Sequence, residues 1–276
     1  MKKLLALSLL ASISCFGQTN FQIGYGITDY VNSKTKIDGE TLEASVQQNF
    51  GFGSAAIGYE DTSADRIGTN PTLEVQKTHL KYNHNLGQEG ELQIRYLSIE
   101  DNIAPTDDGK IYGIGGVLKK FDNLSLAAQY YQSDYVSFNV NQYDLIVSKN
   151  FIIDDWKGKI SLNAKQIEID GEKYGNYVFK DKDYSTLGVN LSVNYSGYFA
   201  NIGAMFGKRL FAVLEDGAKV QHHAVEQDKT YMLAFGKKFK SFDLMAKYSF
   251  QNGIELPENQ KDVDTKTTMV SLVYKF

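Results

Sequence analysis

The chain has 276 residues, of which 42% are hydrophobic, and its formal net charge at pH 7 is −4. This length permits one or two ordinary soluble domains, but 18 Tyr and 16 Phe beside only 3 Pro and 1 Trp favour β-strands. The charge balance provides no basic surface, so no nucleic-acid partner is expected.

Residues 1–17 are predicted to be an export signal peptide. Two lysines precede an apolar run over residues 4–13, which is too short to cross a bilayer as a helix, and small residues follow. Cleavage after residue 17 leaves residues 18–276 as the mature domain. A lipid anchor on Cys15 is the rival interpretation, but the leucine that usually lies three positions before a lipidated cysteine is absent. Cleavage would remove the single cysteine, so no disulfide is expected in the mature chain.

The mature chain alternates apolar and polar residues with period two, which is typical of strands with one apolar face. Between Leu187 and Tyr195, every second residue is leucine, valine or tyrosine, and the others are glycine, asparagine or serine. No segment reaches 18 consecutive apolar residues, so no transmembrane helix is expected. Fourteen strands are predicted, at residues 20–31, 41–50, 53–61, 73–84, 91–100, 111–121, 124–134, 140–151, 158–169, 184–195, 198–209, 229–239, 242–250 and 266–276.

Short and long connections alternate between these strands, as they do in outer-membrane barrels. The strands finish on an aromatic residue at the short-turn end, where a ring suits the boundary between lipid and water: Phe50, Phe121, Phe151, Tyr195, Phe239 and Phe276. These features favour an all-β fold, a closed antiparallel up-and-down transmembrane β-barrel of about 14 strands, with 12 or 16 as the neighbouring possibilities. A secreted β-sandwich, the alternative, does not require this alternation.

The final strand places Leu272, Tyr274 and Phe276 on one face and ends the chain on an aromatic residue. This strand and the export signal resemble those of Gram-negative outer-membrane proteins. The resemblance implies a bacterial outer-membrane location among lipid and lipopolysaccharide, periplasmic chaperones on the way there, and an assembly signal formed by these three residues and read by the barrel-assembly machinery. In size and strand count the chain is similar to small monomeric fourteen-stranded porins of the outer membrane protein G type.

The opposite strand face carries charges that are costly in lipid, so it is predicted to line a hydrated lumen. Fourteen strands enclose a backbone cylinder roughly 28 Å across, which is too wide for side chains alone to fill. The expected function is therefore a porin, a water-filled channel for passive diffusion of small hydrophilic solutes and ions, without a cofactor or metal. The alternative is that the positively and negatively charged side chains of this face pair with one another and fill the interior. The pore-lining residues are predicted to be Glu43, Arg95, Asp144, Lys165, Asp243 and Lys247.

Two further alternatives remain open. An outer-membrane barrel enzyme of the lipase or protease type would use histidine with serine or a carboxylate, and a structural or adhesin barrel would need fewer strands. The connection at residues 210–228 is expected to be an exposed loop, although it could also fold inward as a constriction or act as a lid. Its adjacent His222 and His223 are expected to be solvated rather than to form a metal or pH-sensing site, because neighbouring side chains point apart.

Overall fold

The computed structural model describes residues 18–276 except 104, 122, 175 and 176, and it leaves the side chains of 120 and 121 undescribed. The predicted signal peptide, residues 1–17, lies outside the described residues. The strands are β1 Thr19–Val31, β2 Lys36–Phe50, β3 Gly53–Arg66, β4 Leu73–Asn85, β5 Gly90–Asp101, β6 Lys110–Phe121, β7 Leu124–Asp134, β8 Asn139–Ile153, β9 Trp156–Asp170, β10 Lys173–Tyr174, β11 Tyr177–Val178, β12 Asp183–Tyr195, β13 Tyr198–Arg209, β14 Val213–Leu214, β15 Lys219–Val220, β16 Val225–Lys238, β17 Phe242–Glu255 and β18 Gln260–Lys275.

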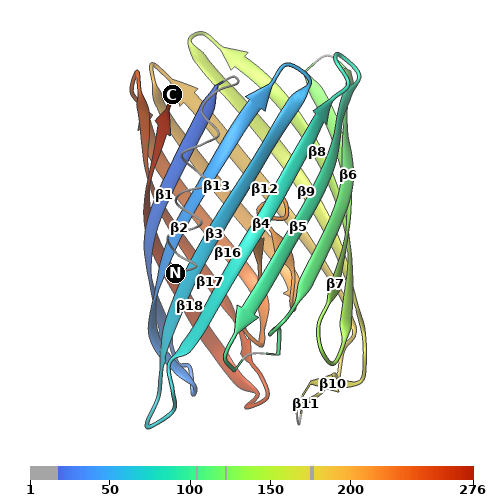
Figure 1. Cartoon of the computed structure of the whole chain (residues 1–276), viewed down its shortest axis with the longest axis vertical. Coiled ribbons are helices and arrows are strands. Elements are labelled where there is room, and N and C mark those ends of the chain that lie inside the picture. Colours follow the sequence, from blue (N-terminus) through green and yellow to red (C-terminus); the bar gives the residue numbers. More distant parts are fainter. Residues whose placement is uncertain (1–17, 104, 122, 175–176) are drawn as a thin grey trace.

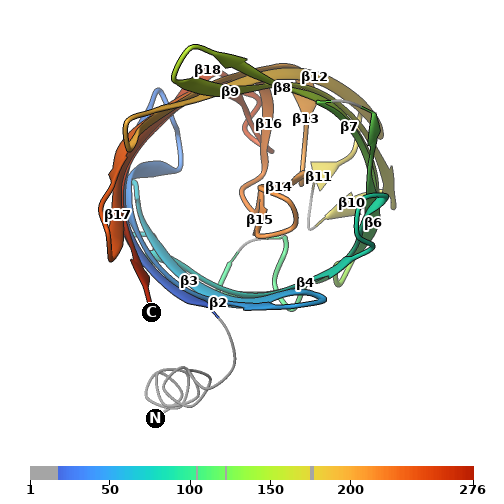
Figure 2. The same cartoon turned by 90° about the horizontal axis from the view of Figure 1, so that it is seen from above.

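Fourteen of these strands form one closed antiparallel barrel, which confirms the predicted fold class and strand number (Figure 1). Each strand pairs with its neighbours along the chain, and β1 closes the ring against β18, with Ile23 opposite Leu272. The hairpins β10–β11 and β14–β15 are separate two-stranded sheets within the connections that follow β9 and β13. Seen along the barrel axis, β14 and β15 lie inside the ring (Figure 2).

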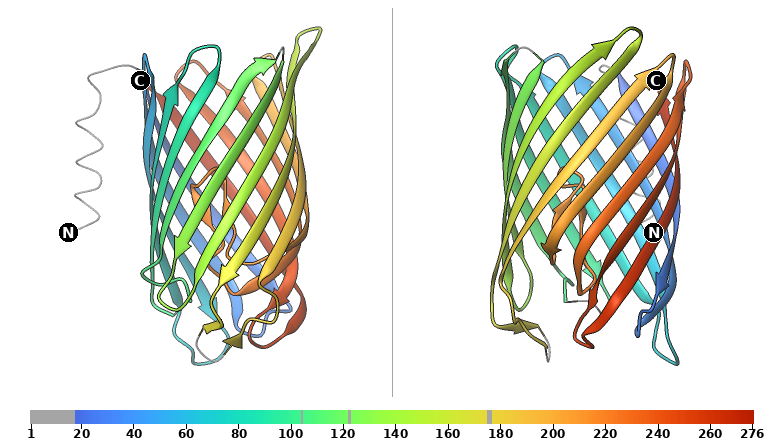
Figure 3. Two further views of the ribbon diagram at one scale, coloured as in Figure 1. Left: turned by 90° about the vertical axis from the view of Figure 1, so that its right-hand side faces the viewer. Right: turned by 180° about the vertical axis from the view of Figure 1, so that it is seen from behind.

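The two ends of the barrel differ in their connections. The short turns lie at the end that carries the chain's C-terminus, and the longer connections lie at the other end (Figure 3). Ser196 and Gly197, for example, form a two-residue turn between β12 and β13 with φ angles of 47° and 82°. Two positive φ angles are typical of the tight turn that matches the twist of paired strands. We call the opposite end the loop end.

Along most of the wall, apolar side chains point outward. Leu187 is 67% exposed and Val189 is 39% exposed, while Gly188 between them faces inward and is buried. Rings at the short-turn end are also exposed, among them Phe50, Tyr195, Phe239 and Phe276, whereas the side chain of Phe121 lies outside the described residues. Such an outer surface fits the hydrocarbon of a bilayer. Among the described residues, no helix is long and apolar enough to cross a membrane.

At the loop end the polarity of the two faces is reversed. Leu97 and Ile99 of β5 face inward and are at most 1% exposed, while the polar residues Ser98 and Glu100 alternate with them. Six inward apolar residues from four other strands join them in one buried cluster: Leu73, Val75, Ile111, Val140, Ile167 and Ile169. Several strands also extend further here than predicted, because the reversal breaks the expected pattern; β2 begins at Lys36 and β17 ends at Glu255.

Candidate functional site: a hairpin inside the lumen

The connection between β13 and β16 enters the barrel instead of leaving it. Leu210, Phe211 and Ala212 have no exposed surface. The hairpin that follows lies in the space enclosed by the barrel wall, at about mid-height (Figures 2 and 3). We call Val213–Val220, comprising β14, β15 and the turn between them, the luminal hairpin. The expectation of an exposed loop is therefore wrong, and the alternative of an inward fold is the one observed.

Aromatic packing holds the base of this segment at the loop end. The ring of Phe211 lies 4.8 Å from Phe138 and 6.0 Å from Tyr135, measured between ring centroids, with Tyr174 and Phe179 completing the cluster. Removing a buried phenylalanine ring typically costs about 3–5 kcal/mol. The base of the hairpin is therefore attached to the inner apolar cluster of the loop end.

The turn of the hairpin is built from charged residues in an unfavourable backbone conformation. Glu215, Asp216 and Gly217 have φ angles of 49°, 55° and 77°. Asn-Gly is the usual choice for such a turn, because left-handed φ angles strain most other side chains. Gly217 has no Cβ, and one placed there would lie 2.9 Å from Cγ of Arg95. Glu215 and Asp216 therefore have unfavourable backbone conformations, and Gly217 packs closely on Arg95.

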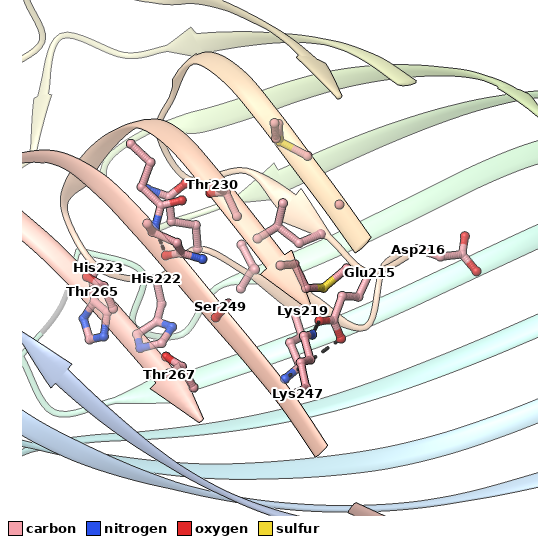
Figure 4. Close-up of a pocket in the computed structure, with 18 of the residues that line it drawn as sticks. Glu215, Asp216, Lys219, His222, His223, Thr230, Lys247, Ser249, Thr265 and Thr267 are labelled. Carbon is pink, nitrogen blue, oxygen red and sulfur yellow. Dashed lines mark hydrogen bonds and ion pairs between the residues drawn. The ribbon is translucent and has the colours of Figure 1, made fainter. Parts of the chain in front are cut away.

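Both carboxylates of the turn meet cations of the wall. Arg95 Nη2 donates to Asp216 Oδ2 at 2.7 Å, and its Nε donates to the Asp216 carbonyl at 3.1 Å. Lys81 Nζ lies 3.8 Å from the same carboxylate and donates to the Glu215 carbonyl at 2.9 Å. Lys247 pairs with Glu215 from the other side (Figure 4). Charge-assisted hydrogen bonds of this kind are stronger than neutral ones.

In a third contact, the hairpin supplies the cation and the barrel wall supplies the carboxylates. Lys219 pairs with Glu43 and lies 3.5 Å from Glu60 and 3.9 Å from Glu215. Burial lowers the pKa of Lys219, but the three carboxylates outweigh it and raise that pKa overall. Burial likewise raises the pKa of Glu215, yet the ammonium groups of Lys219 and Lys247 lower it to about 2. Both groups are therefore charged in the docked hairpin at neutral pH.

All six predicted pore-lining residues face the lumen side, and each has an ion-pair partner. Five contact the hairpin or lie beside it. Glu43 pairs with Lys219, Arg95 with Asp216, and Lys247 with Glu215, while Asp144 pairs with Lys165, whose Nζ also reaches the Val213 carbonyl. Asp243 pairs with Lys275 near the short-turn end, away from the hairpin. Their role in solute passage stays a prediction.

A cavity of about 470 Å³ remains beside the hairpin. Its far side is a hydroxyl-rich wall, formed by Thr28, Thr230, Ser249, Thr265 and Thr267 from β1, β16, β17 and β18 (Figure 4). Met205, Met232 and Met269 line it as well. The charged side chains that line this cavity are in ion pairs, and the rest of its lining combines hydroxyl groups with apolar side chains.

His222 and His223 line the same cavity inside the barrel, where His222 is buried and His223 half-buried, instead of lying on an exposed loop as expected. Their ring centroids are 4.0 Å apart, and Tyr30 Oη lies 3.0 Å from His223 Nε2. Within the part of the chain that the structure describes, His222 Nε2 and His223 Nδ1 have no hydrogen-bond partner. Burial lowers the pKa of both imidazoles well below 6.5. No group of three or more metal-binding side chains occurs among the described residues.

Comparison with known proteins identifies the fold alone. No protein-family model matches the chain, and no curated protein matches it. Among solved structures, a bacterial polysaccharide outer membrane secretin aligns over 94% of this chain and 98% of its own, with a TM-score of 0.59 and 7% identity. The outer membrane protein Omp33 of Acinetobacter baumannii aligns over 94% and 99%, with a TM-score of 0.52 and 9% identity. The chain therefore has the fold of outer-membrane β-barrels, as its sequence predicts.

Proposed function

We propose that the protein is an outer-membrane channel for passive diffusion of small hydrophilic solutes and ions, with the luminal hairpin as its constriction. The observation that carries this proposal is the cavity of about 470 Å³ between the hairpin and the hydroxyl-rich wall. The hydroxyl groups of this wall can replace part of the hydration shell of a passing solute. The protein acts as a single barrel and carries out no chemical step.

The path follows the side of the lumen that the hairpin leaves free. Hydroxyl groups of Thr230, Ser249 and Thr267 offer both donors and acceptors along this side. The charged side chains Glu43, Arg95 and Lys247 of the wall are engaged by the hairpin residues Lys219, Asp216 and Glu215, respectively. Neutral solutes therefore pass as readily as ions of similar size, and charge selectivity is modest.

The test is solute entry into liposomes that contain the refolded protein. The wild type is compared with a short-tip variant, in which Asn-Gly replaces residues 214–219 and keeps Val213 paired with Val220. A pentose should enter both sets of liposomes, and a trisaccharide should enter faster through the short-tip variant. Entry through neither protein, together with hydrolysis of phospholipid or peptide in detergent, would support the enzyme alternative instead.

A further inference from the structure

The acidic turn of the luminal hairpin lies on three cations of the barrel wall. Arg95 and Lys81 come from the neighbouring strands β5 and β4, where they are directly paired in register, and Lys247 comes from β17. Arg95 is only 3% exposed, and its guanidinium also donates to the backbone carbonyls of Tyr82 and Ile94 at 3.0 Å each. Two carbonyls of the wall therefore hold the guanidinium in addition to its contacts with the hairpin.

The two carboxylates of the turn use separate cations. Asp216 accepts from Arg95 and lies near Lys81, whereas Glu215 pairs with Lys247. In Figure 4, Asp216 extends away from the group formed by Glu215, Lys219 and Lys247. The wall thus presents two positive positions, and the turn presents one carboxylate to each.

The backbone conformation of the turn indicates that the charge of these carboxylates, and not the geometry of the turn, is the reason for acidic residues at these two positions. Glu215 and Asp216 both have positive φ angles, which cost non-glycine residues about 1–2 kcal/mol each. Asn-Gly would close the same hairpin with less strain. Strain that the surroundings sustain is often found where a segment has a functional contact.

We infer that Lys81, Arg95 and Lys247 form a luminal binding site for a small dicarboxylate, and that Glu215 and Asp216 occupy this site in place of the solute. A guanidinium binds a carboxylate through parallel N–H donors, and an ammonium binds the second carboxylate as a point charge. A dicarboxylate entering the lumen competes with the turn and displaces the hairpin tip. This inference names the solute class of the proposed channel and rests on that function for its physiological meaning.

Calorimetric titration of the refolded barrel in detergent with succinate tests the site without any measurement of permeation. The double variant Glu215→Gln with Asp216→Asn removes the competing charges, and the site should then bind succinate about tenfold or more tightly than in the wild type. The short-tip variant removes both carboxylates by a different route and should show the same gain. Adding Arg95→Gln to either variant should abolish the gain, and the neutral diamide succinamide should bind to none of them.

Glu91→Gln is the matched control, because it neutralises a carboxylate of β5 that pairs with Lys119 near the short-turn end, away from the hairpin. Its affinity for succinate should equal that of the wild type. The inference is overturned if the double and short-tip variants, folded as judged by circular dichroism, bind succinate no more tightly than the wild type. It is also overturned if the gain survives Arg95→Gln. Since permeation is not measured, either result leaves the channel proposal standing.

Discussion

Individual residues in this barrel are constrained by which face of the wall they occupy. In β12, Leu191 follows the outward positions of Leu187 and Val189, and Asn190 faces the lumen, where it exchanges amide hydrogen bonds with Asn201. The sequence alone predicts which of these residues faces lipid, because side chains alternate between the two faces of a strand and only one face contacts lipid.

Arginine substitutions at these two neighbours should differ in cost. Leu191→Arg should lower the free energy of unfolding by about 2–4 kcal/mol if the residue lies near the bilayer midplane, because the guanidinium would enter hydrocarbon. Asn190→Arg, the matched control, places the same group in a hydrated lumen and should cost little. Reversible unfolding in lipid measures both, and equal losses would contradict the register of β12.

Gly217 is constrained by two features at once. It has a φ angle of 77°, and a Cβ there would contact the side chain of Arg95. Gly217→Ala should therefore release the hairpin tip and lower the hydrogen-exchange protection of the Lys219 amide, which mass spectrometry measures. Gly87→Ala provides the control, since Gly87 has a φ angle of 71° and nothing within 4 Å. Protection of Lys219 equal to that in the wild type would show that the close packing is unimportant.

At the scale of elements, the strands were predictable and the luminal hairpin was not. The alternation of apolar and polar residues with period two located all fourteen barrel strands, because contact of one strand face with lipid imposes this alternation within each strand. Entry of the hairpin depends on ion pairs that join residues more than one hundred positions apart, such as Arg95 with Asp216, and no local pattern records them. Two signals were nevertheless present: the apolar run 210–213 inside a connection, and the inward Leu97 and Ile99 beside outward polar residues.

Docking of the hairpin should weaken as the pH falls. The docked state holds His222 and His223 with pKa values well below 6.5, so protons bind the undocked state preferentially once the pH drops below about 6.5. Glu215, with a docked pKa of about 2 against an ordinary 4.5, adds stability that is lost between those values. The titratable or charged groups that face the histidines from the packed strands are Tyr30, Lys36, Glu60 and Lys77.

Hydrogen exchange of the amides of residues 210–224, corrected for the intrinsic pH dependence, measures this docking. Protection should decline from pH 6.5 downward in the wild type. In a His222→Asn, His223→Asn variant the decline should begin only near pH 4.5, where Glu215 starts to protonate in the undocked state. Protection that is constant between pH 7 and pH 4 in the wild type would contradict the prediction.

The assembly signal that the resemblance to outer-membrane proteins implies stays a prediction, and its residues lie at the end of the last strand, β18, and just beyond it. Leu272, Tyr274 and Phe276 face outward and are at least 36% exposed, as an assembly signal read from the lipid side requires. Deleting Phe276 should reduce the level of assembled barrel in cells much more than it lowers the stability of refolded barrel. Assembly at the wild-type rate and level would show that the terminal ring is not part of the signal.

At the scale of the whole molecule, the polarity of the inner face of the barrel changes along its length. Over most of its length it is polar inside and apolar outside, as lipid requires, while the loop end has an apolar interior that packs on Phe211. This inner cluster anchors the segment that then places charged residues at mid-lumen. The barrel width that fourteen strands impose is therefore filled partly by the chain itself, and the cavity beside the hairpin is what remains for solutes.

Single-channel current in planar bilayers tests this account most directly, with the wild type and the short-tip variant recorded under the same salt. The account predicts stable conductance steps for both proteins, with steps about twofold or more larger for the variant, because removal of the tip widens the narrowest part of the lumen. Asp243→Asn should leave the step size of the wild type unchanged. Equal steps from the wild type and the short-tip variant, or no steps from either, would contradict the account.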